Sequence, residues 1–188
     1  MRIFISVELP EEIKNNIAKN TAQLREIESG IKWVDVHNLH VTLKFLGWVE
    51  DKNLENLVAL SEKAIKGNKS FKVKFVGLGS FPEGKSPRVF WIGISEGGEN
   101  LKQIADKLQE FRSEEREFSA HLTIGRVKDK KGVDKVKEKM QGIEKTSFGE
   151  FLVDRVNIMK STLTPKGPIY ETYKSIKLIA KQKKEESI

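Results

Sequence analysis

The sequence predicts an α+β fold with two mostly antiparallel sheets flanked by helices. Helical and strand-like hydrophobic periodicities are interspersed along the 188 residues, which supports this class. Several neighbouring strands are also joined by loops too short for a parallel crossover, which favours antiparallel pairing. No low-complexity linker divides the chain, so we expect residues 1–188 to form a single domain.

The first half of the chain begins with an apolar segment, residues 2–8, that is typical of a strand. Pro10 suits the first turn of a helix, and aliphatic residues then recur at helical spacing until Gly30, a natural C-terminal stop. Residues 40–45 are rich in β-branched and aromatic side chains, as strands are. The other elements expected here are a short strand at 31–34, a helix at about 53–66 and an alternating strand at 71–75.

The second half opens with a loop at residues 79–87, where glycine and proline gather. A helix at 98–112 carries aliphatic residues on one face, and a weaker, very basic helix follows at about 133–141. Residues 164–168 predict a hairpin-like turn, and the charged tail at 181–188 should be frayed. The strands expected around these elements cover 88–95, 118–127 and about 147–153, 155–163 and 169–179.

Composition narrows the function. The net charge of +7 and the pI near 9.4 favour a polyanionic partner, nucleic acid first. The chain has no cysteine, which excludes thiol catalysis, disulfides and thiolate metal sites. Its three histidines would need carboxylates to complete a zinc site, and we expect no metal and no cofactor. No apolar run reaches the ~18 residues of a membrane helix, and we expect a cytoplasmic protein without a membrane partner.

A weak internal repeat carries the most informative residues. Each half contains a strand, a helix and then a strand with His-x-Thr, an aliphatic residue and a glycine, at His40–Gly47 and His121–Gly125. Because strand side chains alternate between faces, His40 and Thr42 should share one face, followed by Lys44. The opposite face should bury the intervening residues Val41, Leu43 and Phe45, and in the second motif Leu122 and Ile124, with His121 and Thr123 presented together.

Paired imidazoles and hydroxyls suit phosphoryl chemistry. With a reference pKa of about 6.5, one histidine can deprotonate a water while the other protonates the departing alkoxide. The hydroxyls of Thr42 and Thr123 can donate hydrogen bonds to the non-bridging phosphate oxygens. A single His-x-Thr is more often structural, but two of only three histidines in the same pattern favour catalysis. The third, His37, lacks the pattern and is expected to be a bystander.

Two cations are candidates for substrate binding. Lys44 has the strand parity of His40 and Thr42. Parity puts Arg126 on the face opposite His121 unless the strand bulges or ends there, so a phosphate contact and a surface salt bridge both stay open.

The chain resembles the two-histidine (2H) phosphoesterases and, within them, the bacterial and archaeal RNA 2′,3′-cyclic phosphodiesterases once named 2′-5′ RNA ligases. The resemblance rests on segments spread over nearly the whole chain, at residues 2–6, 32–34, 38–47, 87–93, 121–126 and 161–171. It implies a bilobal fold of two interleaved lobes with pseudo-two-fold symmetry and a central cleft. It also implies hydrolysis of RNA 2′,3′-cyclic phosphate ends to a 2′-phosphate without a cofactor, with His40 as proton donor and His121 as proton acceptor.

Three alternatives remain beside this interpretation. A 2′-5′ RNA ligase would run the reverse reaction with the same residues, because a 5′-hydroxyl would replace water as the nucleophile. A non-catalytic RNA-binding module would keep its affinity without either histidine, and a metal hydrolase is disfavoured by the missing ligands. The partner expected is RNA with 2′,3′-cyclic phosphate ends, tRNA fragments being one candidate, and we expect a monomer.

Overall fold

The computed structural model describes residues 1–84, 86–111, 117–165 and 167–180. Its elements run in the order β1 (Arg2–Glu8), α1 (Glu11–Arg25), β2 (Ile31–Trp33), η1 (Val36–Asn38), β3 (His40–Trp48), α2 (Asp51–Ile65), β4 (Phe71–Phe81), β5 (Val89–Glu96), α3 (Gly98–Lys107), η2 (Leu108–Phe111), β6 (His121–Val127), α4 (Val133–Gln141), β7 (Ser147–Val153), β8 (Arg155–Thr164) and β9 (Gly167–Lys177). Among these helices, none is long and apolar enough to cross a lipid bilayer.

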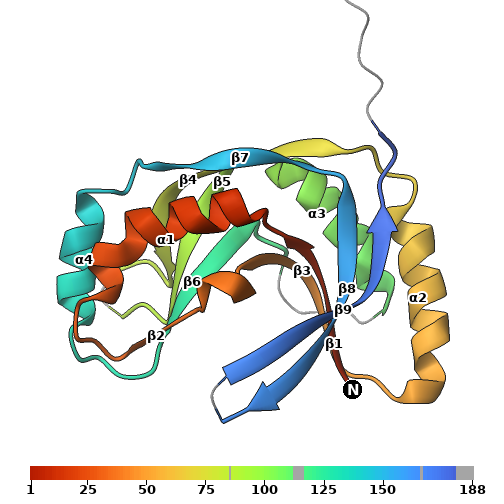
Figure 1. Ribbon diagram of the computed structural model, residues 1–188, viewed down its shortest axis with the longest axis horizontal. Coiled ribbons are helices and arrows are strands. Elements are labelled where there is room, and N and C mark those ends of the chain that lie inside the picture. The colour runs from red at the N-terminus through yellow and green to blue at the C-terminus, as the bar shows by residue number, and fades with distance from the viewer. Residues whose placement is uncertain (85, 112–116, 166, 181–188) are drawn as a thin grey trace, which may run out of the picture.

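The strands form two antiparallel sheets. The first has the order β3-β1-β8-β9 and the second β2-β6-β5-β4-β7. Apart from β2, the two orders correspond strand for strand, with β3 in the place of β6 and β1 in the place of β5. The expected α+β class with pseudo-two-fold symmetry is therefore confirmed, and each sheet holds one His-x-Thr strand (Figure 1).

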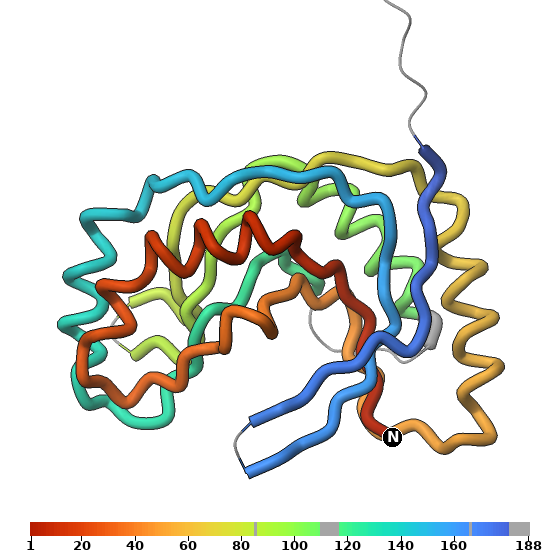
Figure 2. Tube along the Cα trace, viewed as in Figure 1, coloured from red at the N-terminus to blue at the C-terminus, as the bar shows by residue number. Residues whose placement is uncertain are grey.

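The helices tie the two sheets together. Helix α1 follows β1 of the first sheet but packs on β7 of the second, where Asn16 Nδ2 donates a hydrogen bond to the Phe148 carbonyl oxygen at 2.9 Å. Helix α3 follows β5 of the second sheet and contacts β3 of the first, while α2 packs beside α3 and β9. The C-terminal part of the chain returns to the first sheet, where β8 pairs with β1 and β9 pairs with β8 (Figure 2).

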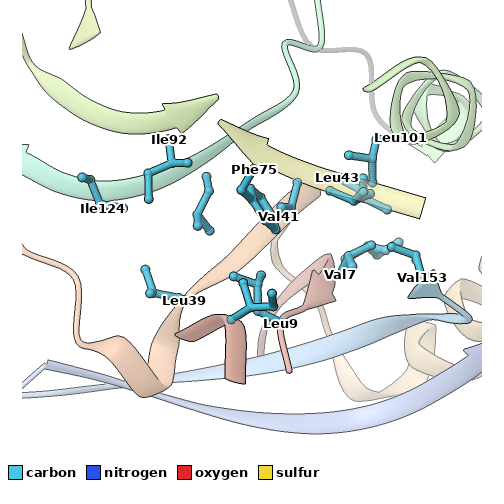
Figure 3. Close-up of a cluster of buried hydrophobic side chains, with 14 of the residues drawn as sticks. Val7, Leu9, Leu39, Val41, Leu43, Phe75, Ile92, Leu101, Ile124 and Val153 are labelled. Atoms are coloured by element: carbon cyan, nitrogen blue, oxygen red, sulfur yellow. The ribbon is translucent and has the colours of Figure 1, made fainter. Parts of the chain in front are cut away.

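One continuous apolar core backs both motif strands. Val41 and Leu43 from β3 are buried in the same cluster as Ile92 from β5 and Ile124 from β6, and α3 adds Leu101 (Figure 3). Burying an aliphatic side chain of this kind contributes about 1.5–3 kcal/mol to folding. The residues between the histidines and threonines therefore hold each strand firmly against the interior, as strand alternation predicted.

Several element boundaries differ from the expected ones. The expected helix at 98–112 is α3 followed by the 3₁₀ turn η2, and the expected strand at 118–127 begins only at His121. Strand β4 continues to Phe81 where a loop was expected, because Gly79 pairs with Trp91 and lets the indole lie against the backbone. The tail at 181–188 lies outside the described residues.

Candidate active site

His40 stands at the first position of β3, directly after the turn η1. Asp35 caps that turn, its Oδ1 accepting a hydrogen bond from the His37 backbone N–H at 2.9 Å. The Asn38 carbonyl oxygen lies 2.7 Å from Nδ1 of His40. Because a carbonyl oxygen can only accept, Nδ1 carries the proton in this contact and Nε2 is left to serve a ligand.

His121 is held in the same way at the first position of β6. Its Nδ1 lies 2.7 Å from the Ser119 carbonyl oxygen, again two residues upstream. An aromatic ring also stands edge-on to each imidazole, Tyr170 to His40 at 5.2 Å and 89°, and Phe81 to His121 at 5.2 Å and 84°. The two imidazoles are thus fixed by equivalent backbone contacts and similar ring packing.

A bulge in β3 changes the face on which its later residues lie. Thr42 pairs with Ser6 and Lys44 with Ile5, so Leu43 is the extra residue. Directly paired residues point to the same side of a sheet, and alternation along β1 therefore puts Lys44 on the face opposite Thr42. The bulge therefore interrupts the strand alternation expected for Lys44, yet Lys44 still lines one cavity together with His40 and Thr42. Its side chain is buried, and its Nζ donates a hydrogen bond to Gln109 Oε1 at 2.7 Å.

The same bulge brings Phe45 to the face of His40. Phe45 pairs with Phe4, which shares the face of Ser6 and Thr42. The expectation that Phe45 is a core residue is wrong, since its side chain is 55% exposed.

Strand β6 carries a bulge at the corresponding position. Thr123 pairs with Trp91 and Gly125 with Phe90, so the extra residue is Ile124. Arg126 pairs with Val89 and returns to the face of His121 and Thr123. The bulge that the sequence left open is therefore present, and it turns Arg126 toward the histidine side of the strand.

The two motif strands converge on one cavity of about 170 Å³. Strands β3 and β6 contact each other directly, although they belong to different sheets. The cavity, called here the catalytic cavity, is lined by both candidate pairs and by both candidate cations, namely His40, Thr42, His121, Thr123, Lys44 and Arg126. His37, in contrast, is exposed and does not line it.

Burial is the largest influence on the pKa of both imidazoles. It lowers the pKa of His40 and the pKa of His121 below the ordinary histidine value, and the nearby Arg126 guanidinium lowers both further. At His40 the carboxylate of Glu8, its partner across the β1–β3 ladder, acts in the opposite direction. The corresponding partner of His121 is Gly93, which has no charge. Within the described residues, no cluster of three or more His, Asp or Glu side chains is arranged to hold a metal ion.

Sequence reasoning missed three aromatic neighbours of the site. Phe4 lies 4.9 Å from His40 and 5.0 Å from Tyr170, ring centroid to ring centroid, and Phe81 lies beside His121. Each aromatic residue reaches its histidine from a different strand, so no local sequence pattern predicts the contact. For Arg126 a signal existed, because a glycine inside a strand such as Gly125 often marks a bulge.

Comparison with known proteins agrees with this geometry. A family model described as LigT like Phosphoesterase matches the chain twice, over residues 7–91 and 92–170. Each match contains one His-x-Thr strand, so the repeat seen in the sequence is a repeat of the family unit itself.

Curated relatives match over nearly their whole length. A protein of Methanocaldococcus jannaschii named RNA 2′,3′-cyclic phosphodiesterase is 40% identical over 177 residues, covering 93% of this chain and 99% of the relative. Proteins of the same name from Archaeoglobus fulgidus and Thermotoga maritima are 39% and 35% identical, with 91% of this chain covered in each case and 97% and 92% of the relative.

Solved structures share the fold. The crystal structure of TT0787 from Thermus thermophilus superposes with a TM-score of 0.80 at 27% identity, covering 96% of this chain and all of that one. Escherichia coli LigT in its apo form gives a TM-score of 0.75 at 23% identity over 95% of this chain and 97% of its own, which is a likeness of fold alone. The double family match, the close relatives and the shared architecture lead to one conclusion: the chain belongs to the LigT-like (2H) phosphoesterases, the family of the RNA 2′,3′-cyclic phosphodiesterases.

Proposed function

We propose that this chain hydrolyses RNA 2′,3′-cyclic phosphate ends to 2′-phosphates by general acid–base catalysis with two histidines. The observation that carries the proposal is the convergence of two equivalent His-x-Thr strands and Arg126 on one small cavity. The names of the curated relatives support the choice of substrate.

The reaction assigns a different role to each imidazole. His121 takes a proton from a water through Nε2 as the water oxygen bonds to phosphorus. The bond between phosphorus and the ribose 3′-oxygen breaks, and His40 gives that oxygen a proton through its own Nε2. The product has a 2′-phosphate and a free 3′-hydroxyl. The proton gained by His121 and the one lost by His40 are then exchanged with solvent, which restores the starting state.

The remaining residues of the cavity stabilise charge on the phosphate. Thr42 and Thr123 lie beside their histidines and can donate hydrogen bonds to the two non-bridging oxygens. Arg126 also lines the cavity, and its guanidinium suits a phosphate through paired N–H donors. Lys44 lines the same cavity, where its ammonium donates a hydrogen bond to Gln109 Oε1, and we assign it no direct contact with the phosphate.

The test is incubation of a synthetic RNA bearing a 2′,3′-cyclic phosphate, followed by identification of its end group. The proposal expects an end that resists a 3′-specific phosphatase and yields to a non-specific one. A 3′-phosphate would reverse the orientation of the ribose, and an unchanged cyclic end would overturn the proposal. Adding an RNA with a 5′-hydroxyl in the same assay detects the reverse reaction, 2′-5′ ligation. A parallel sample dialysed against chelator should keep full activity, whereas activity that returns only with added metal would favour a metal hydrolase.

A further inference from the structure

A second cavity of about 320 Å³ opens beside the catalytic cavity. The two share part of their walls, namely His40, Thr42, Phe45, Thr123 and Arg126. His40 lines both cavities, whereas His121 lines only the catalytic one. The second cavity, called here the His40-side pocket, therefore continues the reaction site on the side of His40. Its volume is in the range of pockets that hold small organic ligands.

The inner wall of this pocket is aromatic. Phe4 forms part of it, and the ring of Tyr170 stands at 70° to Phe4 and at 89° to His40. Phe45 and Leu163 line the same pocket with side chains that are 55% and 64% exposed. Apolar side chains left in solvent beside a polar cavity commonly mark a ligand surface, and aromatic faces suit nucleic-acid bases.

The β8–β9 hairpin that supplies Tyr170 is fixed to the catalytic side. Asn38 Nδ2 donates a hydrogen bond to the Pro168 carbonyl oxygen at 3.2 Å. The carbonyl of the same Asn38 accepts from His40. One residue therefore sets both the orientation of the imidazole and the position of the pocket wall next to it.

The charged residues of the pocket suit a chain of phosphates. Arg126 lies where the pocket meets the catalytic cavity. Arg2 also lines the pocket, from the first strand position, where it pairs with Ser161 and is exposed. Apart from the two arginines and His40, no ionisable side chain except that of Tyr170 lines the pocket among the described residues, so its charge is cationic.

In-line chemistry decides which part of the substrate enters this pocket. The attacking water and the leaving 3′-oxygen lie on opposite sides of phosphorus. The leaving oxygen belongs to the ribose, so the nucleoside must lie on the side of the general acid, away from the water. Within the part of the chain that the structure describes, the pocket that extends the catalytic cavity is lined by His40 and not by His121.

We propose that the His40-side pocket holds the terminal nucleoside of the cyclic-phosphate RNA, with its base against Tyr170 and Phe45. Arg2 then meets the phosphodiester on the 5′ side of that nucleoside. This proposal rests on the proposed function and adds a structural reason for His40, rather than His121, to serve the leaving oxygen.

The test compares two small substrates, adenosine 2′,3′-cyclic phosphate and the base-free 1-O-methylribose 2′,3′-cyclic phosphate. Tyr170→Ala should lower kcat/KM for the nucleoside substrate about tenfold or more, mainly through KM, because a stacked base is lost. For the base-free substrate the loss should be at least about threefold smaller, because the packing of Tyr170 on His40 is lost with both substrates and the stacked base with only one. Tyr170→Phe keeps the ring and should retain activity on both. Tyr173→Ala is the matched control, because Tyr173 lies on the same strand and does not line the pocket.

Arg2 is tested with a longer substrate. Arg2→Ala should lower kcat/KM for a dinucleotide with a cyclic phosphate end and leave the mononucleotide unchanged, whereas Arg155→Ala, the removal of an exposed arginine outside the pocket, should affect neither. An equal loss on the nucleoside and base-free substrates would overturn the pocket assignment alone, because Tyr170 would then act only by supporting His40. A wild-type protein inactive on every cyclic phosphate would overturn the proposed function, and the pocket assignment with it.

Discussion

Strands β3 and β6 have the same backbone plan and different side chains at the positions that follow the bulge. Both begin with a histidine whose Nδ1 bonds a carbonyl two residues upstream, and both carry a threonine on the same face. After the bulge, the residue returned to that face is Phe45 in one strand and Arg126 in the other. The duplicated scaffold therefore keeps the acid–base pair symmetrical, while the bulge lets one half present an apolar ring and the other a cation.

The strongest way to break this comparison is to remove either imidazole. His40→Ala and His121→Ala should each lower turnover of a cyclic-phosphate RNA by at least about 10²-fold. The double variant should be little worse than either single one, because the two groups act as a unit. The rate constant of hydrolysis under single-turnover conditions measures these losses, and circular dichroism verifies that each variant is folded. Full activity in either single variant would exclude the two-histidine mechanism.

The next largest effect is expected from the residue that follows the bulge in β6. Arg126→Ala should lower kcat/KM about 10- to 100-fold, because a charge-assisted contact to the phosphate is lost. Arg126→Lys should recover only part of the loss, since an ammonium cannot donate the paired N–H bonds of a guanidinium. Steady-state kinetics of both variants beside the wild type would decide this. Equal activity in Arg126→Ala and the wild type would leave the arginine as a bystander.

The two threonines should contribute smaller and similar amounts. Thr42→Val and Thr123→Val keep the side-chain shape and remove one hydroxyl donor each, so each should lower kcat about tenfold. Because the strands are equivalent up to the bulge, the two losses should agree within about threefold. A loss confined to one threonine would mean that the phosphate is held mainly by one half of the molecule.

The pH dependence of kcat/KM tests the electrostatic difference between the strands. Activity needs one neutral and one protonated imidazole, so it falls when both are protonated at low pH and when both are neutral at high pH. Burial and Arg126 lower both pKa values, and at His40 Lys14 adds to the lowering while Glu8 opposes it. The maximum should therefore lie below a pH of about 6.5, the ordinary histidine pKa.

Removing the positive charge of Arg126 takes away one cause of this lowering at both histidines. In Arg126→Ala the whole pH profile of kcat/KM should accordingly move to higher pH, even though its maximum value is lower. A profile that stays in place would show that burial alone sets the two pKa values.

The smallest effect on activity is expected at the residue directly after the extra residue of each bulge, which is Lys44 in β3 and Gly125 in β6. Lys44→Met leaves Gln109 without its donor and should lower the free energy of unfolding by about 1–3 kcal/mol, with activity nearly unchanged. Gly125→Ala would bring a Cβ within 2.9 Å of Ile31 and Trp33 and should destabilise the fold by a similar ~1–3 kcal/mol. Thermal unfolding of both variants measures the loss. If the Lys44→Met protein were as stable as the wild type but inactive, the lysine would instead take part in the reaction.

Much of the site could be predicted from the sequence because it follows from local rules. Strand alternation correctly set His40 beside Thr42 and His121 beside Thr123, with aliphatic residues buried between them. The class of fold followed from short connections and mixed periodicity. These features depend on neighbouring residues only.

The rest depended on which strands pair, and that is not a local property. Lys44 and Phe45 depart from the expected strand alternation because the bulge exists only in the register of β3 against β1. Tyr170 reaches His40 through the β8–β9 hairpin, far along the chain. The sequence also predicted α1 and α3 as helices without indicating that each packs on the opposite sheet.

The position of β1 between β3 and β8 determines when the enzyme can fold during its synthesis. A nascent chain that has not yet reached Arg155 leaves one edge of β1 unpaired, and an open apolar strand edge invites association with other chains. The hairpin bearing Tyr170 emerges from the ribosome later still. Because so many pairings join distant parts of the chain, folding should be slow for its size and should finish only after β8 and β9 have been synthesised.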